Sequence, residues 1–288
     1  MARVIGVRVV DLLAQGPTKS FEFFPPKTDA EQATLEAALA ELEPLHPSFV
    51  SVTYRGGRSS RERTTNLVAK LARDTSLTPM AHLICVAHTR AELVDILNDF
   101  KAAGVVNLLA LGGDPPTDEG AEPGELQYAE QLVDLAREIG GFSIGVAAHP
   151  EVHPRSPSRA ADREHLAAKL QKADFAITQL FFRAEDYAAM VDELRALGVT
   201  KPIIAGVMPI TNLNNIKRMA ELSGAAVPQE VVDRVRAVGD DADAVRAVGV
   251  EIATEFCRDL LAMGAAGLQF YTLNKSSATR EIYKNLGF

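Results

Sequence analysis

Short strand-like runs alternate with segments of helical period along almost the whole chain, and this alternation constrains the fold more than any other feature. Apolar, β-rich runs predict eight strands, at residues 19–24, 49–53, 80–85, 106–110, 143–148, 175–179, 203–207 and 267–271. Helical spacing of apolar residues predicts helices such as 31–42, 62–73, 90–103, 128–139, 163–171, 184–197 and 245–263. Strands that alternate with helices form parallel sheets, and eight such units close a barrel. The sequence therefore predicts the α/β class and a (β/α)8 TIM barrel.

Two segments depart from this simple repeat. Residues 112–124 form a loop rich in Gly, Pro and acidic residues, which we expect to be a mobile lid. Extra helices are predicted between strands seven and eight, around residues 214–222, 229–238 and 245–263. No linker interrupts the pattern, so we expect residues 1–288 to form a single barrel domain. A doubly wound open sheet is the alternative, although no Gly-rich dinucleotide fingerprint follows any strand.

The composition is that of a globular protein with a large core. Of 288 residues, 47% are apolar and 24% are charged. The net charge of -8 and the absence of a Lys/Arg stripe disfavour a nucleic-acid partner. The two cysteines have no metal-ligand spacing, and no apolar run approaches the ~20 residues that cross a bilayer. We therefore expect a cytoplasmic protein without a membrane partner, whose oligomeric state the sequence leaves open.

Glu22 lies in a run of aromatic residues within the first predicted strand, Ser-Phe-Glu-Phe-Phe-Pro-Pro at residues 20–26. A carboxylate is costly to bury among phenylalanines unless it is paired or protonated, and such surroundings raise its pKa. A raised pKa suits a group that donates a proton near neutral pH. The alternative is a Glu22 that points to solvent from an alternating strand.

Polar residues follow seven of the eight predicted strands, at the end where TIM barrels carry their active sites. Singly, each has a structural explanation: Thr53 could bond backbone, Asp114 could cap a turn, and Gln179 could be a satisfied core amide. Their joint placement predicts an active site. The residues concerned are Glu22, Thr53, Tyr54, His82, Asp114, His149, His153, Gln179, Tyr271, Asn274 and Lys275.

The histidines also allow a metal site. His149 and His153 are four residues apart, and with His82 and Glu22 they could line the centre of a metal-dependent barrel hydrolase. Pro150 disfavours a helix that would place both histidines on one face. We therefore predict no metal and keep the hydrolase as an alternative.

Eight short runs, in order along the chain, carry a resemblance to one family. They are SFEFFPP at 20–26, FVSVTY at 49–54, AHLIC at 81–85, GDPP at 113–116, VAAHPEVHP at 146–154, AITQLFF at 176–182, GVMPI at 206–210 and FYTLN at 270–274. In these runs, and from about residue 19 to the C-terminus, the chain resembles the methylenetetrahydrofolate reductases. The resemblance implies a barrel that reduces 5,10-methylenetetrahydrofolate to 5-methyltetrahydrofolate with NADH or NADPH, usually through bound FAD.

The same resemblance implies roles for individual residues. Glu22 would be the general acid that helps to open the imidazolidine ring of the substrate to an electrophilic iminium. Substrate-binding positions would be Asp114, Gln179, Tyr271 and Lys275. Cofactor-binding positions, for NAD(P)H or for FAD, would be Thr53, His82, Gly113, Asp114, Tyr128, Ala129, His149, His153, Asp162, His165 and Lys169.

Several flavin-contact positions depart from the family pattern. Gly112 replaces an Arg, Ala168 replaces a second cation, His149 replaces a Tyr, His165 replaces an Asn and Leu213 replaces a stacking aromatic. A bound pyrophosphate needs cations or aimed N–H groups. We therefore interpret the chain as a reductase in which hydride passes directly from NAD(P)H to the folate, with the FAD-mediated reaction as the alternative.

Other questions stay open at this point. Lys275 stands where the family has an Arg, which keeps the charge but loses the bidentate fork. A catalytically silent pterin-binding barrel is a further alternative. Neither the choice between NADH and NADPH nor the partners of the folate glutamate tail follow from the sequence.

Overall fold

Eight parallel strands form a closed barrel in the computed structural model, which describes residues 6–54, 58–114 and 124–288, without the side chains of residues 58–60. Each strand pairs with the next along the chain, and β8 pairs with β1. The strands are β1 Thr18–Phe23, β2 Phe49–Val52, β3 Pro79–Ile84, β4 Asn107–Leu111, β5 Ser143–Ala148, β6 Phe175–Thr178, β7 Ile203–Val207 and β8 Gly267–Tyr271. The predicted TIM barrel is confirmed, and the open-sheet alternative is wrong.

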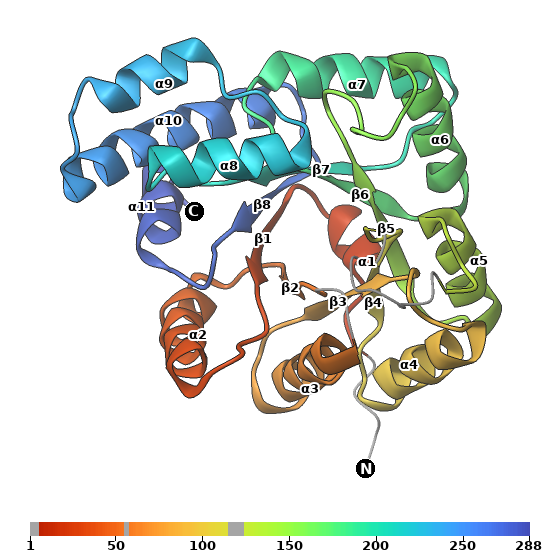
Figure 1. The fold of residues 1–288 in the computed structure, drawn as a ribbon. Coiled ribbons are helices and arrows are strands. Elements are labelled where there is room, and N and C mark those ends of the chain that lie inside the picture. The colour runs from red at the N-terminus through yellow and green to blue at the C-terminus, as the bar shows by residue number, and fades with distance from the viewer. Residues whose placement is uncertain (1–5, 55–57, 115–123) are drawn as a thin grey trace.

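Helices surround the barrel as an outer ring (Figure 1). The ring consists of α2 Asp29–Leu42, α3 Arg58–Asp74, α4 Arg90–Ala102, α5 Ala129–Ile139, α6 Arg159–Lys172, α7 Ala184–Ala196, α8 Leu213–Ser223, α9 Gln229–Arg236, α10 Ala242–Ala262 and α11 Ser277–Leu286, with a 3-10 turn at Glu43–Leu45. The short helix α1 Val9–Leu13 lies at one end of the barrel instead. The extra helices predicted between β7 and β8 are confirmed as α8, α9 and α10. The sequence did not predict α1 or α11. Most of the predicted lid, residues 115–123, lies outside the described residues.

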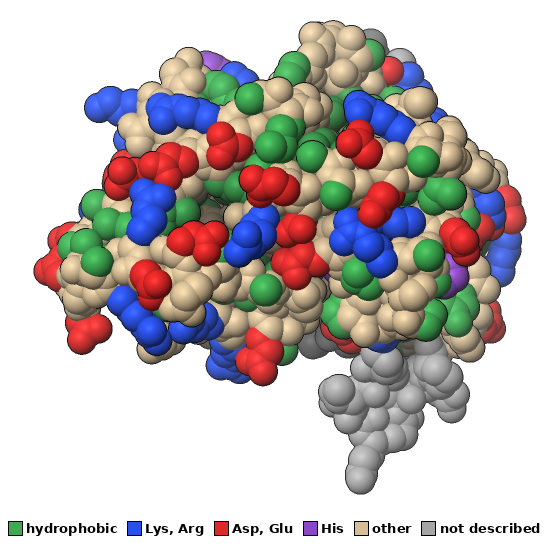
Figure 2. All heavy atoms as spheres, turned by 90° about the horizontal axis from the view of Figure 1, so that it is seen from above, with side chains coloured by type: hydrophobic (Ala, Val, Ile, Leu, Met, Phe, Trp, Pro, Cys, Tyr) green, Lys and Arg blue, Asp and Glu red, His purple; other side chains and the backbone are tan. Residues whose placement is uncertain are grey.

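The outer surface mixes charges of both signs. On the face shown in Figure 2, acidic and basic side chains are interspersed, and neither sign dominates. Ion pairs of neighbouring helices contribute to this mixture, such as Arg159–Glu193 at 2.7 Å and Arg234–Glu255 at 2.6 Å. None of the helices within the described ranges is long and apolar enough to cross a membrane.

The alternation of β1 decides which way Glu22 points. Phe21 and Phe23 are fully buried in the cluster between strands and helices, where the Phe21 ring lies 5.2 Å from that of Tyr283 in α11. Successive side chains of a strand point to opposite faces. Glu22 therefore points into the barrel. This orientation favours the interpretation of Glu22 as a buried carboxyl with a raised pKa over the alternative that it points to solvent.

The helix α1 closes the N-terminal end of the barrel. Its Val9 belongs to an apolar cluster inside the barrel that includes Phe49 and Phe175. The Val9 N–H donates to Asn107 Oδ1 at 2.8 Å, and the Val10 N–H donates to the Ser143 hydroxyl at 3.0 Å. These two acceptors occupy the first positions of β4 and β5. The lower barrel is thus a packed core.

We predict that Asn107→Ala lowers the free energy of unfolding by about 2–4 kcal/mol, because the buried Val9 N–H loses its acceptor and the Asn107 amide no longer donates to Val7. Urea unfolding measures this change. The control is Asn214→Ala at an exposed position of α8, for which we expect a change below about 0.5 kcal/mol. Equal effects of the two substitutions would contradict the anchoring role of Asn107.

Candidate active site

Glu22 and His82 meet inside the barrel, toward the C-terminal ends of its strands. Glu22 is in register with Ser51 of β2 on one side and with Tyr271 of β8 on the other. His82 of β3 brings its Nε2 atom to 3.6 Å from Glu22 Oε2, and both side chains are almost fully buried. The structure thus brings together three of the predicted site residues, Glu22, His82 and Tyr271.

Burial dominates the protonation of this group. It raises the pKa of Glu22 to about 8, against the opposing effect of hydrogen bonds with Gln269 and Ser51. Burial also lowers the pKa of His82 to about 3. Near neutral pH the pair is therefore a protonated carboxyl beside a neutral imidazole rather than an ion pair.

Tyr271 is held in a fixed position at the same mouth. Its hydroxyl donates to the carbonyl of Thr178, and its pKa is raised well above the usual value by burial and by the charge of Glu22. Gly206 of β7 leaves room for this ring, because a Cβ atom there would overlap the Tyr271 hydroxyl and the Thr178 carbonyl. Tyr271 therefore contributes a wall to the site.

Two buried polar atoms at this end of the barrel lack a hydrogen-bond partner among the described residues. They are Thr53 Oγ1 and His82 Nε2. The sequence allowed the Thr53 hydroxyl to bond backbone, but no such hydrogen bond is present in the described part of the chain. Buried polar groups are nearly always hydrogen-bonded in folded proteins, and exceptions need an explanation. A ligand in the mouth would supply the missing partners.

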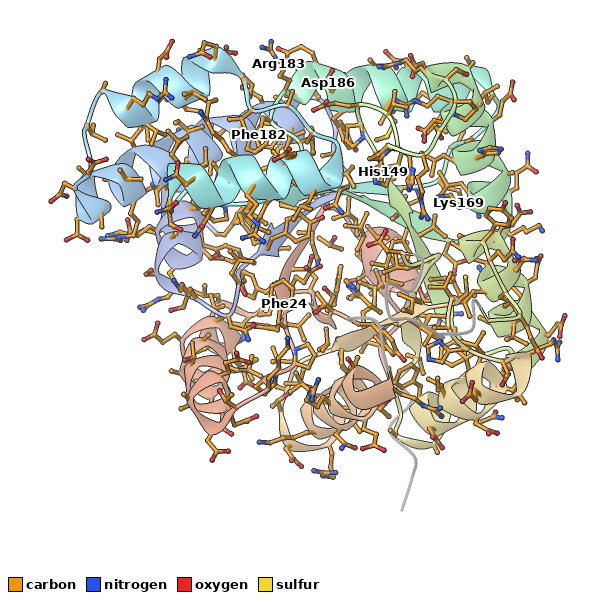
Figure 3. The ribbon with its side chains drawn as sticks, in the orientation of Figure 1. Phe24, His149, Lys169, Phe182, Arg183 and Asp186 are labelled. Carbon is orange, nitrogen blue, oxygen red and sulfur yellow. The ribbon has the colours of Figure 1, made fainter. Side chains whose placement is uncertain are left out.

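A second group lies on the β5–α6 side of the barrel. Figure 3 shows His149 and Lys169 there, with Phe24 just past the end of β1. The rings of His149 and His153 make an edge contact with centroids 4.5 Å apart, and Lys169 Nζ donates to the carbonyl of Ala147 at 2.9 Å. Asp162 accepts a hydrogen bond from the His153 N–H at 3.2 Å. Four predicted cofactor positions are thus neighbours.

Burial removes the positive charge of the two histidines of this second group near neutral pH and leaves Lys169 mostly protonated. Burial is the largest cause in each case: it lowers the pKa of His149 to about 3, lowers that of His153, and lowers that of Lys169 to about 8. The buried Arg163 is occupied, because it donates to the carbonyls of His149, Pro150 and Glu151. It therefore shapes the loop and offers little to a ligand.

Arg155 is a further cation of this region. It is exposed, and its guanidinium donates to the carbonyl of Gly113 at 3.2 Å, which connects the β5–α6 loop to the end of β4. Gly113 has a φ of 87°, and a Cβ there would overlap the Val86 side chain. The close packing at Gly113 explains why glycine is required at this predicted position.

Other predicted residues lie apart or make only local contacts. Tyr128 precedes α5 with 68% of its surface exposed, and Ala129 is the first residue of that helix. The Gln179 side chain accepts a hydrogen bond from the N–H of Leu180 at 2.9 Å. Like Tyr128, the predicted residues Asp114, His165 and Lys275 are exposed at the surface.

Sequence reasoning missed three buried polar residues in the neighbourhood of Glu22, namely Ser20, Ser51 and Gln269. Each lies in a predicted strand, and a polar residue within an apolar strand is the signal that could have identified them. It also missed Arg155 and Arg163, which lie beyond the run at residues 146–154 that carries the family resemblance.

The proposed metal ligands do not form a centre. Within residues 6–54, 58–114 and 124–288, no group of three or more His, Cys, Asp or Glu side chains is placed to hold a metal ion. The set of Glu22, His82, His149 and His153 considered from the sequence is therefore not assembled into one cluster among these residues.

We predict that Glu22→Gln removes a pH dependence of stability. The pKa of Glu22 is raised from 4.5 to about 8 on folding, so the folded protein binds the extra proton between these values and loses stability as the pH rises through them. Between pH 5 and pH 9, the free energy of unfolding of the wild type should fall by roughly a few kcal/mol more than that of the variant. Urea unfolding at both pH values measures it. The exposed Glu164→Gln is the matched control, and an equal pH dependence in wild type and Glu22→Gln would contradict the prediction.

Comparisons with known proteins identify the family of this chain. A sequence profile of methylenetetrahydrofolate reductase matches residues 8–287. The chain is 36% identical over 269 residues to the 5,10-methylenetetrahydrofolate reductases of Pectobacterium carotovorum and Escherichia coli, across 93% of this chain and 89% and 90% of theirs. A Clostridium thermocellum protein, described as binding two copies of 5-methyl-5,6,7,8-tetrahydrofolic acid, shares the fold with a TM-score of 0.62 at 12% identity, over 96% of this chain and 97% of that one. The chain belongs to the methylenetetrahydrofolate reductase family.

Proposed function

We propose that Glu22 is the general acid with which this chain reduces 5,10-methylenetetrahydrofolate, and that the hydride comes directly from NADH or NADPH. The observation that carries the proposal is the buried carboxyl of Glu22, which holds its proton at neutral pH beside a neutral His82. A protonated acid at the open end of a barrel is the group that ring opening requires.

In the proposed reaction, Glu22 gives its proton to one nitrogen of the imidazolidine ring. The bond from that nitrogen to the methylene carbon breaks, and the electron pair stays on the nitrogen. The carbon remains bonded to the other ring nitrogen as an iminium, which accepts the hydride and becomes the methyl group. Direct transfer needs the donor carbon within about 3–3.5 Å of this carbon. Glu22 then recovers a proton from solvent.

The charge around the β5–α6 loop supports direct transfer. Permanently bound FAD would place a pyrophosphate on the barrel, and a buried diphosphate needs several fixed cations. Here Gly112 and Ala168 carry no charge, the imidazoles of His149 and His153 are neutral, and Arg163 is occupied. The residues present therefore fit tightly bound FAD poorly.

A nicotinamide dinucleotide that dissociates in every turnover needs fewer fixed cations than a permanently bound FAD. Lys169 and the exposed Arg155 would supply its phosphates with two cations, and the unpartnered Thr53 and His82 would face its nicotinamide end. The further residues that we propose for this nucleotide are Gly113, Tyr128, Ala129, His149, His153, Asp162 and His165. For the folate, we propose Asp114, Gln179, Tyr271 and Lys275.

We predict that Glu22→Gln retains folate binding but loses at least ~10²-fold in turnover, because the amide keeps the shape of the carboxyl and cannot donate its proton. Stopped-flow or steady-state oxidation of NAD(P)H measures the rate, and calorimetric titration with 5-methyltetrahydrofolate measures binding. Glu164→Gln should match the wild type in both. If Glu22→Gln turns over within a few-fold of the wild-type rate, the acid role is refuted. If the wild type binds folate but shows no turnover, the catalytically silent pterin-binding alternative is favoured.

We also predict that the purified protein shows no visible flavin absorption and releases no FAD on denaturation. Its kinetics should require both substrates to be bound together, since the hydride has no intermediate carrier. Initial rates measured over a grid of both substrate concentrations should give intersecting rather than parallel reciprocal plots. Stoichiometric FAD in the denatured supernatant, with parallel plots, would establish the flavin-mediated alternative.

A further inference from the structure

We propose that Gln269, together with Ser51, is a positioning residue that holds the Glu22 carboxyl and stabilises the carboxylate left behind when the proton departs. The inference rests on the proposed function, because it deepens the role of Glu22 as the acid. Neither residue is among those that the sequence pointed to. Both are fully buried inside the barrel, so their polar groups need hydrogen-bond partners within the protein.

A chain of hydrogen bonds runs from Ser20 through Gln269 to Ser51. The Ser20 hydroxyl donates to Gln269 Oε1, and Gln269 Nε2 donates to the Ser51 hydroxyl at 2.6 Å. Gln269 and Ser51 both act on the nearby Glu22 carboxyl as donors that lower its pKa, and Ser51 is the register partner of Glu22. Because Ser20 occupies the amide oxygen, the amide N–H groups of Gln269 are directed toward Ser51 and Glu22.

The strand register explains why these side chains meet. β1 lies between β2 and β8 in the closed barrel, as Figure 1 shows. Ser51 is in register with Glu22, whereas Gln269 is in register with Ser20, two residues before Glu22 on the same face of β1. The carboxyl is therefore supported from the neighbouring strand and from the layer beneath it.

The chemistry of the donors decides which form of Glu22 they favour. N–H and O–H groups aimed at a carboxyl stabilise its charged form, and they act against burial, which favours the neutral form. The titratable groups that face Glu22 from the other strands are His82 of β3 and Tyr271 of β8. His82 is neutral, and the Tyr271 hydroxyl donates to Thr178, so neither supplies a positive charge to the carboxylate.

This arrangement addresses a requirement of the proposed reaction. Glu22 must be protonated before ring opening and must then exist as a buried carboxylate until it recovers a proton. Burial alone favours the first state and penalises the second. The two donors lower that penalty, so that the acid can release its proton.

The test is the pair of variants Gln269→Met and Ser51→Ala. Methionine approximates the volume of glutamine but removes both amide hydrogens. We expect the high-pH limb of the pH–rate profile, which follows loss of the Glu22 proton, to move upward by about one pH unit in Gln269→Met and by less in Ser51→Ala. Turnover at neutral pH should fall about tenfold in Gln269→Met, because the acid releases its proton less readily.

The matched control is Ser143→Ala, which removes a buried hydroxyl at the opposite end of the same barrel, where it binds the N–H of Val10. This variant should lower the melting temperature without moving the pH–rate profile. A merely structural role for Gln269 would give the same result as the control.

A second readout is independent of turnover. The Glu22 carboxyl carbon can be titrated by NMR in protein labelled at glutamate, with its signal assigned by its loss in Glu22→Gln. An upward shift of its midpoint in folded Gln269→Met supports the inference. An unchanged midpoint in folded Gln269→Met overturns it. A shifted midpoint with no methylenetetrahydrofolate reduction by the wild type instead overturns the proposed function and, with it, the catalytic part of the inference.

Discussion

Closure of the barrel by pairing of β1 with β8 is the constraint on which the site depends. It gives Glu22 a neighbour on each side, Ser51 on β2 and Tyr271 on β8. The same closure brings the loop after β8 onto the end of β1, where the Thr272 hydroxyl donates to the Glu22 carbonyl at 2.6 Å. Asn274 then bonds both the N–H and the carbonyl of Phe24, at 2.8 and 2.9 Å. The backbone that follows Glu22 is therefore fixed by the loop after the last strand.

That loop adopts a conformation with a local cost. Leu273 and Asn274 both have positive φ, 52° and 59°, a region that is unfavourable for side chains other than glycine. Such strain persists where the surrounding contacts impose it, and it is common near functional sites. Here the bonds of Asn274 to Phe24 are the contacts that hold the loop in place, so the strain accompanies the positioning of β1.

The sequence predicted the barrel well because its strands are short, apolar and regularly spaced, and several strand boundaries agree to within one residue. It missed α1, whose five residues are too few to show a helical period, and it missed α11 beyond the last strand. The orientation of Glu22 required the structure, because alternating phenylalanines fit either face. The contacts of Gln269 with Ser51 were also beyond reach, since they join strands that are 218 residues apart in sequence and depend on the register of a closed barrel.

The two ends of the barrel differ in how well their buried polar groups are satisfied. At the lower end, α1, Phe49 and Phe175 form a packed apolar core, and the polar Asn107 and Ser143 are satisfied by the backbone of α1. At the other end, Glu22 is buried with a raised pKa, and Thr53 Oγ1 and His82 Nε2 have no hydrogen-bond partner within the described part of the chain. Each of these features reduces the stability of the folded state without ligand. A protein keeps such groups where substrate and proton transfer require them, and the core beneath supplies the free energy that tolerates them.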